Sequence, residues 1–203
     1  MHHYKELVKR QLLLNGGERT HLSKNPVMSG WVGSIIETFP DARIVVMLRD
    51  PAECVPSLLK LVEISWKSKG WRKEDYAHSL ALLLETSFES FENPAQQLAA
   101  RSNTPRAIVD YRELTRQPQE TVHAVYAALG MTVSPQFDDF LRANAEREKS
   151  HHSKFEYSLG DYALSHEVLE QRLADFYLRY GWPGHSGADP GPGAGTETER
   201  APA

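Results

Sequence analysis

Two short runs of apolar residues stand out from the helical patterns along the chain. Arg43–Leu48 reads RIVVML, and Ala107–Tyr111 reads AIVDY. A short and nearly continuous apolar run indicates a strand that is covered on both faces, as in a parallel sheet. The sequence therefore predicts two buried parallel strands within a chain that is otherwise rich in helix.

Elsewhere, apolar positions recur at helical spacing between caps, prolines and glycines. Asn15-Gly16-Gly17 predicts a helix stop and a turn, and Pro56 predicts a kink or a late helix start because it removes a backbone donor. The expected helices are His3–Leu14, a helix capped by Ser29 and ended by Pro40, Pro51–Trp66, roughly Glu74–Phe91, a stretch to Arg101 after a break at Asn93-Pro94, Pro118–Leu129, Ser134 to about Glu148, and Ser165–Tyr180.

The pattern indicates one domain over residues 1–183 and a disordered tail over 184–203, where Gly, Pro, Ala and Thr dominate. Two strands are too few for a free-standing doubly wound sheet, which averages about five or six strands. The fold class we expect is therefore α/β and helix-rich, with an incomplete parallel sheet.

Composition narrows the function classes. A formal net charge of −4 gives no general case for binding nucleic acid or a membrane surface. No apolar run has membrane-spanning length, and the single cysteine, Cys54, favours a reducing compartment. We expect a cytoplasmic protein in which Cys54 is a small packed side chain rather than a nucleophile.

Candidate chemistry gathers after the first strand. Arg49 follows the strand directly, and ligands of open α/β sheets bind outside the carboxyl ends of the strands. Asp50-Pro51 supplies a helix cap and a first-turn proline, and Ser57 follows about two turns later. A guanidinium and a hydroxyl beside a helix N-terminus indicate a phosphate-binding pair. The alternatives are that Arg49 forms a surface ion pair and that Ser57 caps the helix or bonds back to its backbone.

These residues resemble a known family. The order Lys24-Asn25-Pro26, Phe39-Pro40-Asp41-Ala42-Arg43 and Leu48-Arg49-Asp50-Pro51 with Ser57 is similar to sulfotransferases that use 3′-phosphoadenosine 5′-phosphosulfate. The resemblance is nearest to the branch of bacterial and tyrosylprotein sulfotransferases. It implies a P-loop-like three-layer fold, a nucleotide co-substrate, no metal, and a small-molecule, carbohydrate or lipid acceptor that carries a hydroxyl.

The resemblance also implies residue roles. Arg49 and Ser57 would bind the 3′-phosphate, and Lys24 would contact the transferring sulfuryl group as the catalytic residue. Tyr111 would help to place the nucleotide, or it packs on the sheet as an ordinary aromatic residue. Ser153 and Lys154 would contact phosphate from a late loop. His21 is a weaker alternative as a general base, and His151-His152 lacks a third metal ligand at useful spacing.

One family feature has no counterpart in the sequence. Such enzymes begin with a strand, a Gly/Ser/Thr-rich loop that holds the 5′-phosphosulfate, and a helix, with a carboxylate base shortly afterwards. Here Gly16-Gly17 follows a helical pattern instead. We therefore expect a sheet that lacks its first strand, in either a truncated enzyme with little activity alone or a non-catalytic binding remnant. An incomplete sheet also predicts self-association through exposed strand edges.

Overall fold

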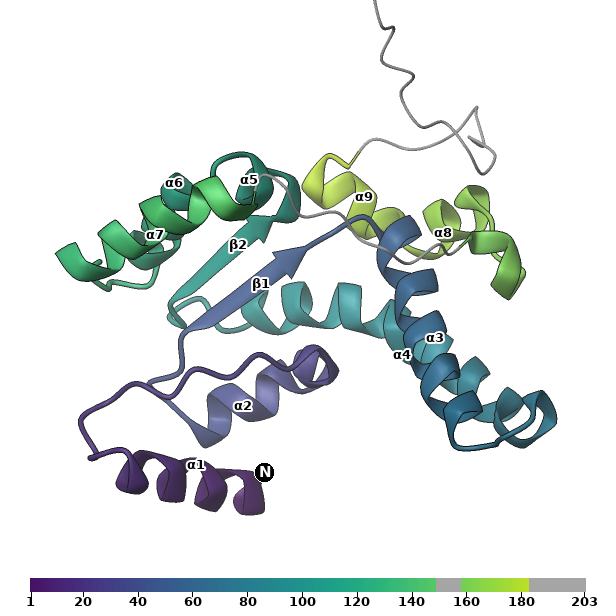
Figure 1. Ribbon diagram of the computed structural model, residues 1–203, viewed down its shortest axis with the longest axis horizontal. Helices are drawn as coiled ribbons and strands as arrows, with labels where there is room; N and C mark the ends of the chain where they lie inside the picture. Colours follow the sequence, from purple (N-terminus) through teal and green to yellow (C-terminus); the bar gives the residue numbers. More distant parts are fainter. Residues whose placement is uncertain (149–157, 183–203) are drawn as a thin grey trace, which may run out of the picture.

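A parallel pair of strands, β1 (Ile44–Leu48) and β2 (Arg106–Asp110), lies at the centre of the computed structural model, which describes residues 1–148 and 158–182 (Figure 1). The register runs from Ile44 opposite Arg106 to Leu48 opposite Asp110, so both strands end at the same level. The expected α/β class with a small parallel sheet is confirmed, and each strand lies within one residue of its predicted range.

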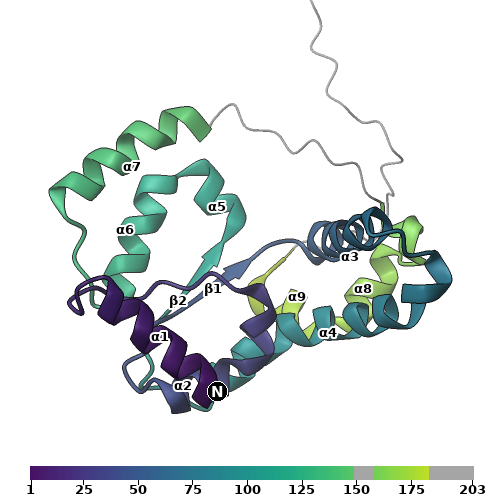
Figure 2. The same cartoon turned by 60° about the horizontal axis from the view of Figure 1, so that its bottom comes forward.

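Helices make up most of the rest of the described chain. α3 and α4 connect the two strands and pack along each other as a hairpin that extends away from the sheet (Figure 2). The helical elements are α1 (His2–Leu14), the 3-10 helix η1 (Pro26–Trp31), α2 (Val32–Thr38), α3 (Pro51–Ser68), α4 (Lys73–Ala99), α5 (Tyr111–Arg116), α6 (Pro118–Ala128), α7 (Pro135–Glu148), the 3-10 helix η2 (Leu159–Tyr162), α8 (His166–Arg172) and α9 (Ala174–Tyr180). Within the described residues, no helix is long and apolar enough to cross a membrane.

The main core covers one face of β1. Leu48 at the end of β1 packs with Phe88 of α4 and with apolar side chains from α8, α9 and the residues around them. The buried members of this core are Leu48, Phe88, Leu169, Leu173, Phe176, Tyr177 and Trp182. Because the core packs against Leu48, it fixes the end of β1 and therefore the position of Arg49, the next residue.

The opposite face of the sheet is covered only in part. α5, α6 and α7 lie on that side (Figure 1), and α6 packs on β2, where Ala107 and Val109 are buried. On β1, Val45 and Met47 are 40% and 50% exposed. The expectation that Arg43–Leu48 is covered on both faces is therefore wrong, because no described element packs over these two side chains.

Three helix boundaries differ from the sequence prediction. α4 continues through Pro94, which is buried, and η1, α2 and α3 pack along this helix, so tertiary packing outweighs the cost of the proline. Ser29 lies inside η1 and caps nothing, and the first α-helical residue after it is Val32. The helix expected over Ser165–Tyr180 is divided into α8 and α9 at Leu173.

The Gly16-Gly17 pair ends α1, as expected. The Gly17 N–H donates to the Leu12 carbonyl at 2.8 Å, and the two glycines have φ of 93° and 76°. Glycine adopts this left-handed region without the steric cost that other residues meet. In α3, the helix begins at Pro51, so the late start considered for Pro56 does not occur.

A buried carboxylate joins α3, α4 and η2. Glu63 of α3 is 9% exposed, and its oxygens accept hydrogen bonds from the hydroxyls of Tyr76 at 2.9 Å and Tyr162 at 3.3 Å. The Lys67 ammonium lies 3.1 Å from the same carboxylate. Burial raises the pKa of Glu63, but the hydrogen bonds from Lys67, Tyr76 and Tyr162 outweigh burial and hold that pKa below its usual value.

We expect Glu63→Gln to lower the free energy of unfolding at pH 7 by about 1–3 kcal/mol, because the buried Tyr76 hydroxyl and the part-buried Tyr162 hydroxyl lose a charged acceptor. The pKa of Glu63 is lower in the folded chain than in the unfolded chain, so its contribution is complete above the unfolded value. It is lost as the pH falls through the folded value. Urea unfolding of both proteins at pH 7 and pH 4 should show the gap between them narrowing. A gap independent of pH would contradict this account.

Candidate functional site

Arg49 and Tyr111 meet where the two strands end. Arg49 follows β1, Tyr111 follows β2, and the register places their preceding residues opposite each other. The Arg49 guanidinium carbon lies 4.8 Å from the centre of the Tyr111 ring, a cation–π contact. The structure thus brings together two of the residues that the sequence singled out, although Tyr111 opens α5 instead of ending the strand.

Both chain turns at the strand ends are set by aspartate caps. The Asp50 carboxylate accepts a hydrogen bond from the Ala52 N–H at 2.8 Å, and Pro51 occupies the first position of α3. The Asp110 carboxylate accepts one from the Arg112 N–H at 2.8 Å and so begins α5. These caps turn each strand directly into a helix, so the side chains after the strands lie at the carboxyl edge of the sheet.

Arg49 is held by an acidic residue of α3. Its Nε donates to the Glu53 carboxylate at 2.9 Å, an i,i+4 pair whose side chains are 36% and 54% exposed. Ser57 is half-buried one helical turn further along α3. Its hydroxyl forms no hydrogen bond with any described residue, so the back-bonding alternative is not seen.

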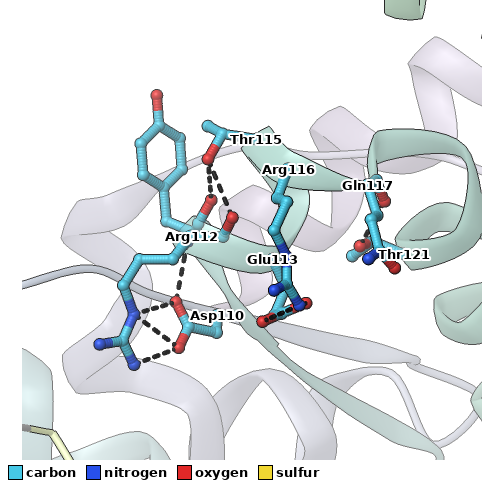
Figure 3. A network of polar contacts seen from close by, with 8 residues as sticks. Asp110, Arg112, Glu113, Thr115, Arg116, Gln117 and Thr121 are labelled. Atoms are coloured by element: carbon cyan, nitrogen blue, oxygen red, sulfur yellow. Dashed lines mark hydrogen bonds and ion pairs between the residues drawn. The ribbon is translucent and has the colours of Figure 1, made fainter.

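Arg112 is a second guanidinium at the strand ends, and the sequence reasoning missed it. Its Nε and Nη2 atoms donate to both oxygens of Asp110, at distances from 2.6 to 3.1 Å (Figure 3). Its guanidinium carbon also lies 3.9 Å from the ring centre of Trp182. The hydrogen bonds from Arg112 hold the pKa of Asp110 below its usual value, even though burial acts the other way. Arg112 therefore links the end of β2 to Trp182, two residues after the end of α9.

Lys24 is not in contact with this cluster. It lies in the exposed segment between α1 and η1, and its ammonium forms no hydrogen bond or ion pair within the described residues. Asn25, which precedes Pro26, has φ −146° and ψ 96°, the extended conformation expected before a proline. His21 lines an open hollow of about 140 Å³ beside the end of α1, and neither Arg49 nor Tyr111 lines that hollow.

Ser153 and Lys154, like the paired histidines before them, lie outside the described residues. Burial raises the pKa of the Cys54 thiol to about 11, although the Arg49 charge acts in the opposite direction. The thiol therefore stays protonated near neutral pH, which fits the interpretation of Cys54 as a packed side chain. The described residues contain no group of three or more side chains able to hold a metal ion.

Comparison with known proteins identifies the family. A model of the sulfotransferase family matches residues 2–135, which include Lys24, Arg49, Ser57 and Tyr111. A solved structure, the sulfotransferase STF9 from Mycobacterium avium, superposes with a TM-score of 0.62 at 18% sequence identity. The match covers 77% of this chain and 40% of that protein, so the chain spans about two fifths of its length. No curated protein matches the sequence significantly.

The two matches agree with the features already described. The structural match supports the α/β arrangement in which β1 and β2 are placed, and the family model spans the segment from α1 to the start of α7. The family model covers well over half of the chain. The chain therefore belongs to the sulfotransferase family.

Proposed function

We propose that this chain binds 3′-phosphoadenosine 5′-phosphosulfate at the ends of β1 and β2 and serves transfer of a sulfuryl group to a hydroxyl acceptor. The observation that carries this proposal is the contact between Arg49 and Tyr111, in which residues from two strands meet at one edge of the sheet. A guanidinium that is 36% exposed can bind a phosphate, and an adjacent ring that is 39% exposed offers an apolar face.

The proposed roles follow from these positions. Arg49 binds the 3′-phosphate through its N–H groups, and the hydroxyl of Ser57 on α3 adds a further donor. Tyr111 orients the guanidinium and helps to place the nucleotide. The nucleotide supplies the sulfuryl group when bound, and Lys24 is our candidate for stabilising the negative charge that develops during transfer. Ser153 and Lys154 are proposed as further phosphate contacts.

A second candidate function is a nucleotide-binding or partner-binding protein without transfer activity. It is favoured by one observation: in the described residues, Gly16-Gly17 follows helix α1, and no strand leads into a Gly/Ser/Thr-rich loop. A 5′-phosphosulfate needs such a cradle of backbone N–H groups. The sequence encoded directly upstream of Met1 separates the two functions, because an in-frame strand, loop and helix there would favour transfer.

Arg49→Ala should weaken binding of adenosine 3′,5′-bisphosphate by about ten- to a hundredfold, since a hydrogen bond to a charged group contributes about 1.5–3 kcal/mol. Isothermal titration calorimetry of wild type and variant measures this. Arg142→Ala is the matched control, because Arg142 forms an exposed ion pair with Asp138 on α7. Binding that is absent, or equally tight in wild type and Arg49→Ala, would contradict the proposed site.

A further inference from the structure

The charges at the strand ends do not favour an incoming anion. Two guanidinium groups, Arg49 and Arg112, stand among three carboxylates, Asp50, Glu53 and Asp110, which leaves a formal charge of −1. A phosphate that binds here must either overcome this charge or displace one of the carboxylates. The contacts of each carboxylate show which one can move.

Asp50 and Asp110 are committed to the fold. Each caps a helix through a 2.8 Å hydrogen bond from a backbone N–H. Both oxygens of Asp110 also accept hydrogen bonds from the Arg112 guanidinium. Removing either cap would destabilise the start of α3 or α5. Neither carboxylate can leave its position without a cost to the local structure.

Glu53 differs from these two aspartates. The contact that the structure shows for its carboxylate is the 2.9 Å hydrogen bond from Arg49 Nε, and the side chain is 54% exposed. Because the side chain is exposed, rotation about its side-chain bonds carries the carboxylate into water. Glu53 occupies a donor of the guanidinium that we assign to the nucleotide phosphate.

We propose that the Glu53 carboxylate occupies the place on the Arg49 guanidinium that a phosphate would take. A bound phosphate displaces this carboxylate, so Glu53 lowers the affinity of the site for anions. This inference rests on the proposed function. In the ligand-free protein, Glu53 and the Tyr111 ring hold the guanidinium at the strand ends, and the phosphate takes over the position of the carboxylate. Glu53 is thus an affinity-determining residue that needs no contact with the nucleotide.

The test is Glu53→Gln, because glutamine keeps the length of the side chain and an oxygen that can accept from Arg49 Nε. The variant loses only the negative charge. We expect it to bind adenosine 3′,5′-bisphosphate about two- to fivefold more tightly than wild type, as follows from the strength of an exposed ion pair. Affinity is measured by calorimetry at fixed low ionic strength, since salt screens such a pair.

Glu6→Gln is the matched control. Glu6 forms an exposed ion pair with Lys9 on α1 at 2.8 Å, so this variant has the same change of net charge away from the strand ends. A rise in affinity in both variants would mean that net charge is responsible, and the inference would be overturned. A rise in Glu53→Gln alone supports the contact between Glu53 and Arg49.

A second readout does not involve a ligand. The NMR signal of the Arg49 Nε–H, assigned by its loss in Arg49→Lys, should shift in Glu53→Gln and stay in place in Glu6→Gln. If binding depends on Arg49 while Glu53→Gln leaves the affinity and this signal unchanged, the inference fails and the proposed site stands. If no variant shows binding that depends on Arg49, both fail.

Discussion

The 203-residue polypeptide alone is expected not to transfer sulfuryl groups at an enzymatic rate, with turnover reduced toward the uncatalysed background. Arg49, Ser57 and Tyr111 offer contacts for one end of the nucleotide, but the described residues show no loop of backbone N–H groups after a strand for the other end. Loss of one preorganised donor typically costs about a hundred- to a thousandfold in rate. Loss of general-base assistance costs about a hundred- to ten-thousandfold more. Together these losses amount to about ten-thousandfold to ten-millionfold in rate.

The assay is transfer of labelled sulfate from 3′-phosphoadenosine 5′-phosphosulfate to a panel of phenols, sugars and tyrosine peptides. Lys24→Ala shows whether any transfer depends on the proposed catalytic lysine, and it should leave the fold intact because Lys24 is exposed. Robust transfer that Lys24→Ala abolishes would show that this polypeptide holds a phosphate loop of its own. The turn around Gly16-Gly17 and the hollow beside it would then be the first segment to test.

The strand ends could be predicted from sequence because their signals are local. A short apolar run ending in Arg49-Asp50-Pro51 combines a buried strand, a cap and a first-turn proline, and each signal acts within a few residues. The second apolar run gave a similar strand signal, but the sequence analysis did not identify Asp110 as a cap and did not predict the helix that begins at Tyr111. Once two parallel strands end at one level, the residues after them must lie near each other, so the meeting of Arg49 and Tyr111 follows from register.

Other parts of the site depend on contacts that are distant in sequence. No local pattern marks Arg112 as the partner of Trp182, seventy positions later, because that contact exists only when α9 packs against the core. The position of Pro94 inside α4 was missed for a similar reason. A proline is a local helix breaker, and only packing along α4 by η1, α2 and α3 reveals that the helix continues.

The apolar character of β1 shows a further limit of sequence reasoning. Val45 and Met47 have the hydrophobicity of covered residues, yet they are 40% and 50% exposed in the described chain. Hydrophobicity indicates that a side chain can be buried, but not which segment covers it. The self-association expected from an incomplete sheet stays a prediction, and these two residues are where it would begin.

Phe176→Ala is expected to have the largest effect on stability, about 3–5 kcal/mol of unfolding free energy. Phe176 is 2% exposed at the centre of the main core. Its ring lies between 5.2 and 6.0 Å from the rings of Phe91, Tyr177, Tyr180 and Trp182, as measured between ring centres. Removing it leaves a cavity that these rings cannot fill without moving. Typical domains have only about 5–15 kcal/mol of total stability, so the variant should be close to unfolding.

Leu178→Ala on the same helix is the control, because Leu178 is 85% exposed and its truncation leaves no cavity. Phe176→Leu should fall between the two, since it refills part of the volume. Urea unfolding followed by circular dichroism gives all three free energies. A change at Phe176 should also affect the strand ends. Phe176 packs on Trp182, and the Trp182 ring stacks on the Arg112 guanidinium, which donates hydrogen bonds to Asp110. Phe176→Leu should still fold, and we therefore expect it to shift the NMR signals of Arg112. Equal unfolding free energies of Phe176→Ala and wild type would contradict the first expectation and show that this core does not support α9.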